Sequence, residues 1–267
     1  MGILKEVQKT ISVNAGHHDL DTGQVVIADN GIDVKENEQV KKIRDLVVPM
    51  LEKCGFRVIW VPDNLNLDKS IELTNKEIPT LNAGLAIDIH LNARGPAQLG
   101  AEVRGTEVYS GTSPNSRTIA NTISKYVSRA LDTVDRGYRP DTVSAVGSLG
   151  WIRLTKCWAV VIECCYLDNQ YDRNVLFKGY ESIALGITKA ICELFETPFH
   201  PSLIKNDWKP IPVQPPREID RNLIFILQEK ILKMSFLLVD LLQKLIILKQ
   251  SKHNPVIGKM YKLFGVK

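Results

Sequence analysis

Short hydrophobic runs alternate with longer segments of helical periodicity over the first two hundred residues. The short runs are rich in β-branched residues and predict strands, whereas residues that recur every three to four positions predict amphipathic helices. The predicted strands are 10–13, 56–61, 85–91, 102–109 and 159–162. The predicted helices are 36–53, 68–83, 116–131 (capped by Ser113 or Asn115) and 182–195. This alternation predicts an α/β fold, with a mainly parallel twisted sheet and helices on both faces.

The pattern changes after residue 198, where six prolines within residues 198–216 predict a stiff, extended linker. Beyond it, hydrophobic residues recur at alternating steps of three and four, which is the heptad spacing of a coiled coil. They are Ile224, Leu227, Ile231, Met234, Leu238, Leu241, Leu245 and Leu248. We therefore expect a long C-terminal helix after the α/β domain. The expected parts are an α/β domain over 1–198, a linker over 199–217, an amphipathic heptad helix over 218–250 and a basic tail over 251–267.

The heptad spacing of residues 218–250 favours a homo-oligomer or docking onto a partner helix. The broad hydrophobic stripe and the basic flanks favour contact with a membrane surface or an anionic wall polymer instead. Packing against the α/β domain is the third alternative. A transmembrane span is not expected, because only ten residues separate Lys233 from Lys244 and Asp240 is among them. A span needs about 20 apolar residues.

The amino-acid composition is that of a globular protein. Hydrophobic residues make up 44% and charged residues 24% of the 267, which is ordinary for a globular protein and excludes disordered, collagen-like and disulfide-scaffold classes. The net charge is +4, but residues 201–267 hold 12 Lys and Arg against five Asp and Glu, so the α/β part is slightly acidic. This balance gives no signal for a nucleic-acid partner.

The cysteines and the N-terminal residues indicate the cellular compartment in which the protein is made. The five cysteines include no CxxC pair, which favours free thiols in a reducing environment. Cys164 and Cys165 flank Glu163, and we expect them to be small packing residues rather than nucleophiles. Residues 1–14 lack the apolar core of a signal peptide, so we expect synthesis in the cytoplasm without a signal peptide.

Chemically reactive side chains follow three of the predicted strands. His17 lies after the first, His90 near the end of the third, and Glu163 directly after the last, while Glu36 begins the first helix. Active sites of open α/β sheets lie beyond the carboxyl ends of the strands. Two imidazoles and a carboxylate from separate elements make a zinc site of the catalytic type, and a further carboxylate supplies a general base.

Each of these residues also has a purely structural interpretation. A histidine is often only a hydrogen-bonded structural residue, and Glu36 suits the first turn of a helix, where an acid stabilises the helix dipole. Glu163 is harder to explain structurally, because a carboxylate at the end of a buried strand is costly unless it is paired or bound. The combination therefore favours the functional interpretation.

The order and spacing of the motifs resemble the zinc-dependent N-acetylmuramoyl-L-alanine amidases of the amidase-3 type, in particular phage endolysins. The resemblance covers about residues 8–196. It is carried by Gly16-His17, Ile89-His90-Leu91-Asn92-Ala93, Ala159-Val160-Val161-Ile162-Glu163, Leu167-Asp168-Asn169 and the first helix ending at 51–58. It implies that residues 1–198 form a zinc amidase catalytic domain, that His17, His90 and one glutamate bind Zn²⁺, and that Glu163 is the catalytic acid and base.

The third metal ligand is either Glu36 or Glu38. Counting back from Gly55 in the helix register of the family leads to Glu36. The helical periodicity agrees, because Glu36 shares a face with Val40, whereas Glu38 lies with Lys42 on a more solvated face. We favour Glu36 and keep Glu38 as the alternative.

The resemblance implies a bacteriolytic hydrolase with peptidoglycan as its substrate. It would degrade the cell wall by cleaving the amide bond between N-acetylmuramic acid and L-alanine, as a phage or prophage endolysin that acts at the wall after release by another factor. One alternative is another zinc amide hydrolase, such as a peptidoglycan carboxypeptidase. A second is a catalytically degenerate wall-binding or assembly module of a phage tail-like particle.

Overall fold

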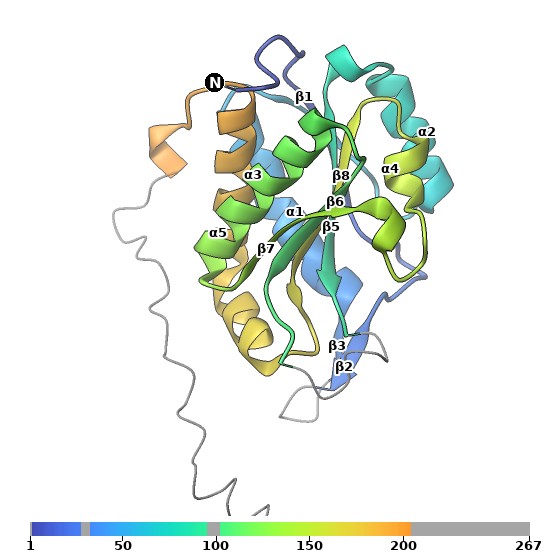
Figure 1. Cartoon of the computed structure of the whole chain (residues 1–267), viewed down its shortest axis with the longest axis vertical. Helices are drawn as coiled ribbons and strands as arrows, with labels where there is room; N and C mark the ends of the chain where they lie inside the picture. The colour runs from blue at the N-terminus through green and yellow to red at the C-terminus, as the bar shows by residue number, and fades with distance from the viewer. Residues whose placement is uncertain (1, 28–32, 95–101, 204–267) are drawn as a thin grey trace, which may run out of the picture. The chain divides into compact units, whose positions relative to one another are not determined.

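The computed structural model describes residues 2–27, 33–94 and 102–203 (Figure 1). They belong to the first of the two units into which the chain divides, Met1–Pro212. The predicted heptad helix over 218–250, the basic tail and most of the predicted linker lie outside the described residues. No helix within the described ranges combines the length and the hydrophobicity that crossing a membrane requires.

A six-stranded sheet forms the centre of the fold, in the order β4-β1-β5-β8-β6-β7. The bounds are β1 (Thr10–Ala15), β4 (Arg57–Trp60), β5 (Leu85–Asn92), β6 (Thr106–Ser110), β7 (Asp135–Pro140) and β8 (Trp158–Tyr166). β4, β1, β5 and β8 run parallel to one another, β6 is antiparallel to β8, and β7 is parallel to β6. The predicted α/β fold with a mainly parallel sheet is confirmed.

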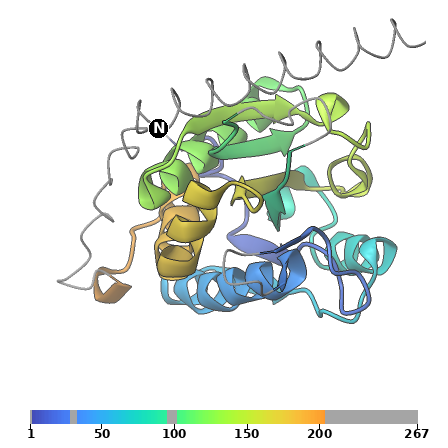
Figure 2. The same cartoon turned by 90° about the horizontal axis from the view of Figure 1, so that it is seen from below.

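Helices cover both faces of this sheet (Figures 1 and 2). The larger hydrophobic core lies between one face and α1 (Glu36–Lys53), α3 (Pro114–Leu131) and α5 (Gln170–Leu194). A smaller core lies between the other face and α2 (Leu67–Glu77) and α4 (Gly150–Leu154). Side chains on β5 alternate between the two cores: Ile87 and Ile89 enter the larger, and Ala86 the smaller. Asp88 and His90 therefore lie on the α2/α4 face.

Several predicted helix boundaries agree with the structure, and two do not. The first predicted helix, 36–53, coincides with α1, and α3 is capped by Ser113, whose Oγ accepts a hydrogen bond from the Ser116 backbone N–H. The prediction of 68–83 is too long: α2 stops at Glu77, because the residue before Pro79 disfavours helical geometry. The prediction of 182–195 is too short, because buried polar residues obscure the periodicity of the first turns of α5.

The hydrophobic pattern did not predict the strand β7 or the short helix α4. It also missed the antiparallel pair β2 (Val25–Ile27) and β3 (Asp33–Lys35) and the 3₁₀ turns η3 (Asp141–Val143) and η4 (Pro201–Leu203), while η1 (Leu81–Ala83) lies within the predicted helix 68–83. Segments of three to six residues are too short, or in β7 too polar, for a hydrophobic periodicity to be recognised. The predicted strand 102–109 is also displaced, since β6 begins only at Thr106.

The placement of Glu163 at the end of its strand was wrong. β8 continues to Tyr166, and Glu163 pairs with His90 of β5 on one side and with Glu107 of β6 on the other. The strand continues because Cys164 and Cys165 are fully buried and add to the larger core. Glu163 thus projects from the interior of the sheet rather than from its rim.

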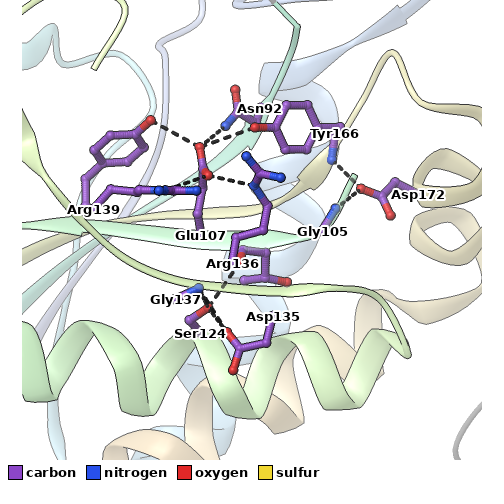
Figure 3. Close-up of polar contacts among 12 residues, drawn as sticks. Asn92, Gly105, Glu107, Ser124, Asp135, Arg136, Gly137, Arg139, Tyr166 and Asp172 are labelled. Carbon is purple, nitrogen blue, oxygen red and sulfur yellow. Dashed lines mark hydrogen bonds and ion pairs between the residues drawn. The ribbon is translucent and has the colours of Figure 1, made fainter. Parts of the chain in front are cut away.

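The buried carboxylate of Asp172, near the start of α5, connects three segments of the chain (Figure 3). One oxygen accepts the backbone N–H groups of Gly105, at 2.7 Å, and of Tyr166, at 2.8 Å. The other oxygen accepts the hydroxyl of Thr133 at 2.7 Å. Asp172 therefore fixes the end of β8 and the start of β6 relative to α5.

We predict that Asp172→Ala lowers the free energy of unfolding by about 3–5 kcal/mol, because it leaves two backbone N–H groups and one hydroxyl buried without an acceptor. Chemical denaturation measures the loss. Asp135→Ala is the matched control: Asp135 also accepts a backbone N–H and a hydroxyl, from Gly137 and Ser124, but it is exposed. We expect the control to cost less than about 1 kcal/mol, and equal losses would contradict the assignment.

Candidate active site

Three predicted site residues come together from separate elements. His17 lies in the loop after β1, Glu36 is the first residue of α1, and His90 lies near the end of β5. One potential ligand atom from each lies within 4.8 Å of the others. The sheet order explains this, since β1 and β5 are neighbours and α1 begins beside their carboxyl ends.

The carboxylate of Glu36 lies between the two imidazoles. Its Oε2 is 3.1 Å from Nε2 of His17, and its Oε1 is 3.1 Å from Nδ1 of His90. The same oxygens accept the backbone N–H groups of Gln24 and Leu91, both at 2.9 Å. Glu36 is only 2% exposed, so its orientation is fixed by these contacts.

A second carboxylate holds each histidine from its far side. Nδ1 of His17 is 2.8 Å from Asp21, and Nε2 of His90 is 3.1 Å from Asp88, which accepts a further hydrogen bond from Asn14. When the far nitrogen donates to its carboxylate, the nitrogen facing Glu36 is left as a lone-pair donor. Metal-binding histidines in proteins are oriented in this way.

The backbone packs closely against the same rings. A Cβ atom on Gly16 would lie 2.3 Å from the His90 ring, and one on Gly23 would lie 2.5 Å from the His17 ring and 2.6 Å from a Glu36 oxygen. His17 itself has φ +68°, a left-handed conformation that is uncommon for a residue other than glycine. A conformation of this kind persists where the surroundings fix it, and it occurs frequently at functional sites.

The three groups shift one another's protonation. Burial would raise the pKa of Glu36, but hydrogen bonds and charges of both histidines outweigh it and hold that pKa far below its usual range. Burial would lower the pKa of His17 and of His90; carboxylates raise both instead, Glu36 mainly for His17 and Asp88 together with Glu36 for His90. A compact site of one anion and two basic nitrogens results, a set of groups that could hold a metal ion in exchange for protons.

The alternative third ligand, Glu38, is not part of this cluster. It is exposed and forms an ion pair with Lys35 at 3.6 Å. Two residues along a helix turn a side chain by about 200°, so Glu36 and Glu38 cannot face the same site. Of the two candidates, the structure brings only Glu36 to the histidines.

Glu163 lies beside the cluster, in the same cleft. Its register partner is His90, and one of its carboxylate oxygens is enclosed without a hydrogen-bond partner among the described residues. The cleft has a volume of about 400 Å³, and its lining includes His17, Glu36, His90 and Glu163. The lining also includes the apolar side chains of Leu65, Leu67, Leu149 and Trp151.

The thiols next to Glu163 are packing residues, as predicted. Cys164 and Cys165 are both fully buried, and burial raises the pKa of each thiol well above its usual value. Neither thiol is among the residues that line the cleft.

Sequence reasoning missed the two orienting carboxylates. Asp88 precedes His90 by two residues on a strand, so the two share a face, and this spacing could have identified it. Asp21 lies in an irregular loop, where no periodicity places its side chain. The role of Glu107, described below, was also missed.

Solved structures of peptidoglycan amidases share this fold. The catalytic domain of CwlV, an amidase from Bacillus (Paenibacillus) polymyxa var. colistinus, is 26% identical, with a TM-score of 0.59, and the match covers 72% of this chain and 100% of that one. An N-acetylmuramoyl-L-alanine amidase from Clostridium difficile 630 is 20% identical, with a TM-score of 0.60 and coverage of 72% and 98%. CwlD from Clostridioides difficile, solved in complex with the GerS lipoprotein, is 20% identical, with a TM-score of 0.55 and coverage of 71% and 97%.

A comparison with curated proteins gives no match. The protein-family model Amidase_3, described as N-acetylmuramoyl-L-alanine amidase, matches residues 11–193. The matched segment is more than half of the chain and includes His17, Glu36, His90 and Glu163. The chain therefore belongs to the Amidase_3 family of N-acetylmuramoyl-L-alanine amidases.

Proposed function

We propose that the protein is a zinc-dependent amidase that hydrolyses the bond between the lactyl group of N-acetylmuramic acid and L-alanine in peptidoglycan. The observation that carries the proposal is the convergence of His17, Glu36 and His90 in one cleft beside Glu163, which has one carboxylate oxygen without a hydrogen-bond partner in the part of the chain that the structure describes. Membership of the amidase family supports the choice of bond.

The residues present suit zinc. Two imidazole nitrogens and one carboxylate are a ligand set of catalytic zinc sites, which keep a further position open for water or substrate. We propose that Nε2 of His17, Nδ1 of His90 and the carboxylate of Glu36 hold the ion, with Asp21 and Asp88 orienting the two rings. When bound, zinc supplies a Lewis acid that polarises the scissile carbonyl and acidifies the attacking water.

Glu163 is placed to move the proton. Burial raises the pKa of its carboxyl to about 8; the charges of Glu36 and Glu107 add to this rise, and that of His90 opposes it. A carboxyl group whose pKa lies near neutrality can both accept and return a proton under working conditions. We propose that Glu163 takes a proton from the attacking water and delivers it to the leaving nitrogen of L-alanine.

The proposed amidase activity also implies a site of action. A peptidoglycan amidase acts where its substrate lies, at the cell wall. The role of a phage or prophage endolysin, and the association through residues 218–250, remain predictions from the sequence.

We predict that Glu163→Gln retains zinc and lowers kcat/KM on purified peptidoglycan by about 100- to 10,000-fold, because it removes the proton carrier but no ligand. Metal analysis and product analysis measure the two effects. The wild type should release new amino-terminal L-alanine. Released D-alanine would identify a carboxypeptidase instead, and loss of zinc in the variant would make Glu163 a ligand.

We predict that Glu36→Ala weakens zinc binding by more than about 100-fold, because even residues that only orient a ligand contribute 10- to 100-fold. Glu38→Ala is the matched control, being an acid in the same helical turn that faces solvent, and it should leave affinity unchanged. Competition with a fluorescent chelator measures both affinities. The reverse ranking would overturn the assignment of the third ligand.

We predict a pH-dependent stability difference between the metal-free wild type and metal-free Glu163→Gln. The pKa of Glu163 is raised to about 8 on folding, so the folded state favours the protonated form. The contribution of this group to stability is therefore fully present below its unfolded pKa, near 4.5, and is lost as the pH rises through 8. Denaturant titrations should show the variant as the more stable protein at pH 8.5, with a smaller difference at pH 4. A difference that does not change with pH would contradict the buried position of this carboxyl.

A further inference from the structure

A second buried carboxylate lies next to Glu163 across the sheet. Glu107 of β6 is the register partner of Glu163 and is 4% exposed. Its Oε2 accepts from Nε of Arg136 at 2.8 Å and from Nε of Arg139 at 3.2 Å, and its Oε1 accepts from Nδ2 of Asn92 at 2.8 Å (Figure 3). The two guanidinium groups hold the pKa of Glu107 below its usual range against the opposing effect of burial. Glu107 is therefore an ionised acceptor that carries no proton.

Two tyrosine hydroxyls complete the coordination of Glu107. The hydroxyl of Tyr109 lies 3.1 Å from Oε1 and that of Tyr166 lies 3.3 Å from the same atom. Since Glu107 has no proton to give, each hydroxyl must donate. Burial and the charge of Glu107 raise the pKa of both phenols, so both keep their protons at physiological pH.

The two tyrosines differ in what else they contact. Tyr109 lines the cleft that holds Glu163 and the histidine cluster. It pairs with Val161 on β8, so its side chain lies on the same face as Glu163, one diagonal step away. Tyr166 is 2% exposed and is not among the residues that line this cleft. The same hydrogen bond to Glu107 thus occurs once at the cleft wall and once inside the protein.

We propose that the Tyr109 hydroxyl is a substrate-binding subsite that accepts a hydrogen bond from one of two amide N–H groups of the muropeptide, that of the residue after L-alanine or that of the N-acetyl group. Its single proton is committed to Glu107, so the hydroxyl offers the cleft only lone pairs. A carbonyl oxygen would find no donor there, whereas the peptide stem and the N-acetyl group of the substrate both carry amide N–H groups. The proposal rests on the proposed function and adds a specificity determinant to it.

The test compares Tyr109→Phe with Tyr166→Phe on a soluble N-acetylmuramoyl-L-alanyl-D-isoglutamine substrate. Both variants remove one hydrogen bond to Glu107, but only the first removes an acceptor from the cleft. We expect Tyr109→Phe to raise KM about five- to tenfold, as the loss of one hydrogen bond implies, with kcat and zinc content unchanged. Tyr166→Phe should keep KM within about twofold while lowering the melting temperature.

Substrate analogues identify the N–H. One analogue is N-methylated at the amide nitrogen of D-isoglutamine and the other at the acetamido nitrogen. We expect one of them to bind the wild type about five- to tenfold more weakly than the parent substrate, and to bind Tyr109→Phe no more weakly than the parent does. If the analogue methylated at D-isoglutamine binds more weakly, the N–H comes from the peptide stem. If the analogue methylated at the acetamido nitrogen does, the N–H comes from the sugar.

Binding measurements separate this proposal from the proposed function. Calorimetry with Glu163→Gln and with Glu163→Gln/Tyr109→Phe reports affinity for the parent compound without turnover. Failure of the wild type to cleave the muramoyl–alanine bond would count against the proposed function. Four results would overturn the subsite. KM of Tyr109→Phe could equal that of the wild type, or KM could rise equally in both tyrosine variants. Tyr109→Phe could lose zinc, or the parent compound and both analogues could bind equally well.

Discussion

The site depends on one buried ionised carboxylate. Glu36 lies at the start of α1 with almost no exposure to solvent, and burial alone would favour its neutral form. It stays ionised because two imidazoles and two backbone N–H groups face its oxygens. In return it holds together a loop, a helix terminus and a strand that share no other polar centre of this kind among the described residues. The close approach of Gly16 and Gly23 and the left-handed backbone of His17 follow from this convergence.

The position of Glu163 within β8 determines the surroundings of its carboxylate and hence its affinity for a proton. A carboxylate at a strand end would be open to water, whereas one in the middle of a sheet is flanked by the side chains of both neighbouring strands. Here the neighbours are His90 and Glu107. One oxygen of Glu163 is enclosed and has no hydrogen-bond partner within residues 2–27, 33–94 and 102–203, so burial and neighbouring charges set the proton affinity of the group.

The sequence predicted those features that a repeating pattern encodes. The alternation of strands and helices predicted the α/β fold, and the periodicity of residues 36–53 predicted α1 to the residue and favoured Glu36 over Glu38. Features that depend on contacts distant in the chain were not predictable in this way. The extent of β8 beyond Glu163 depends on the pairing of Tyr166 with Asn92 of β5, and the role of Asp21 depends on an irregular loop. Glu107 could not be found from its own strand, because its five hydrogen-bond donors come from four strands.

Three carboxylates, Glu36, Glu163 and Glu107, are close enough to influence one another, and their environments separate their roles. Two imidazoles neutralise Glu36, and two guanidinium groups neutralise Glu107. Glu163 lies between them, and burial together with the neighbouring negative charges raises its pKa against the opposing charge of His90. Neighbouring like charges can all be ionised only at a high cost, and in this structure the two outer carboxylates are the ones paired with cations. The cations on either side of Glu163 thereby separate its pKa from those of Glu36 and Glu107, which the proposed proton transfer by Glu163 requires. The ionised Glu107 accepts the proton of the Tyr109 hydroxyl, which the proposed subsite requires.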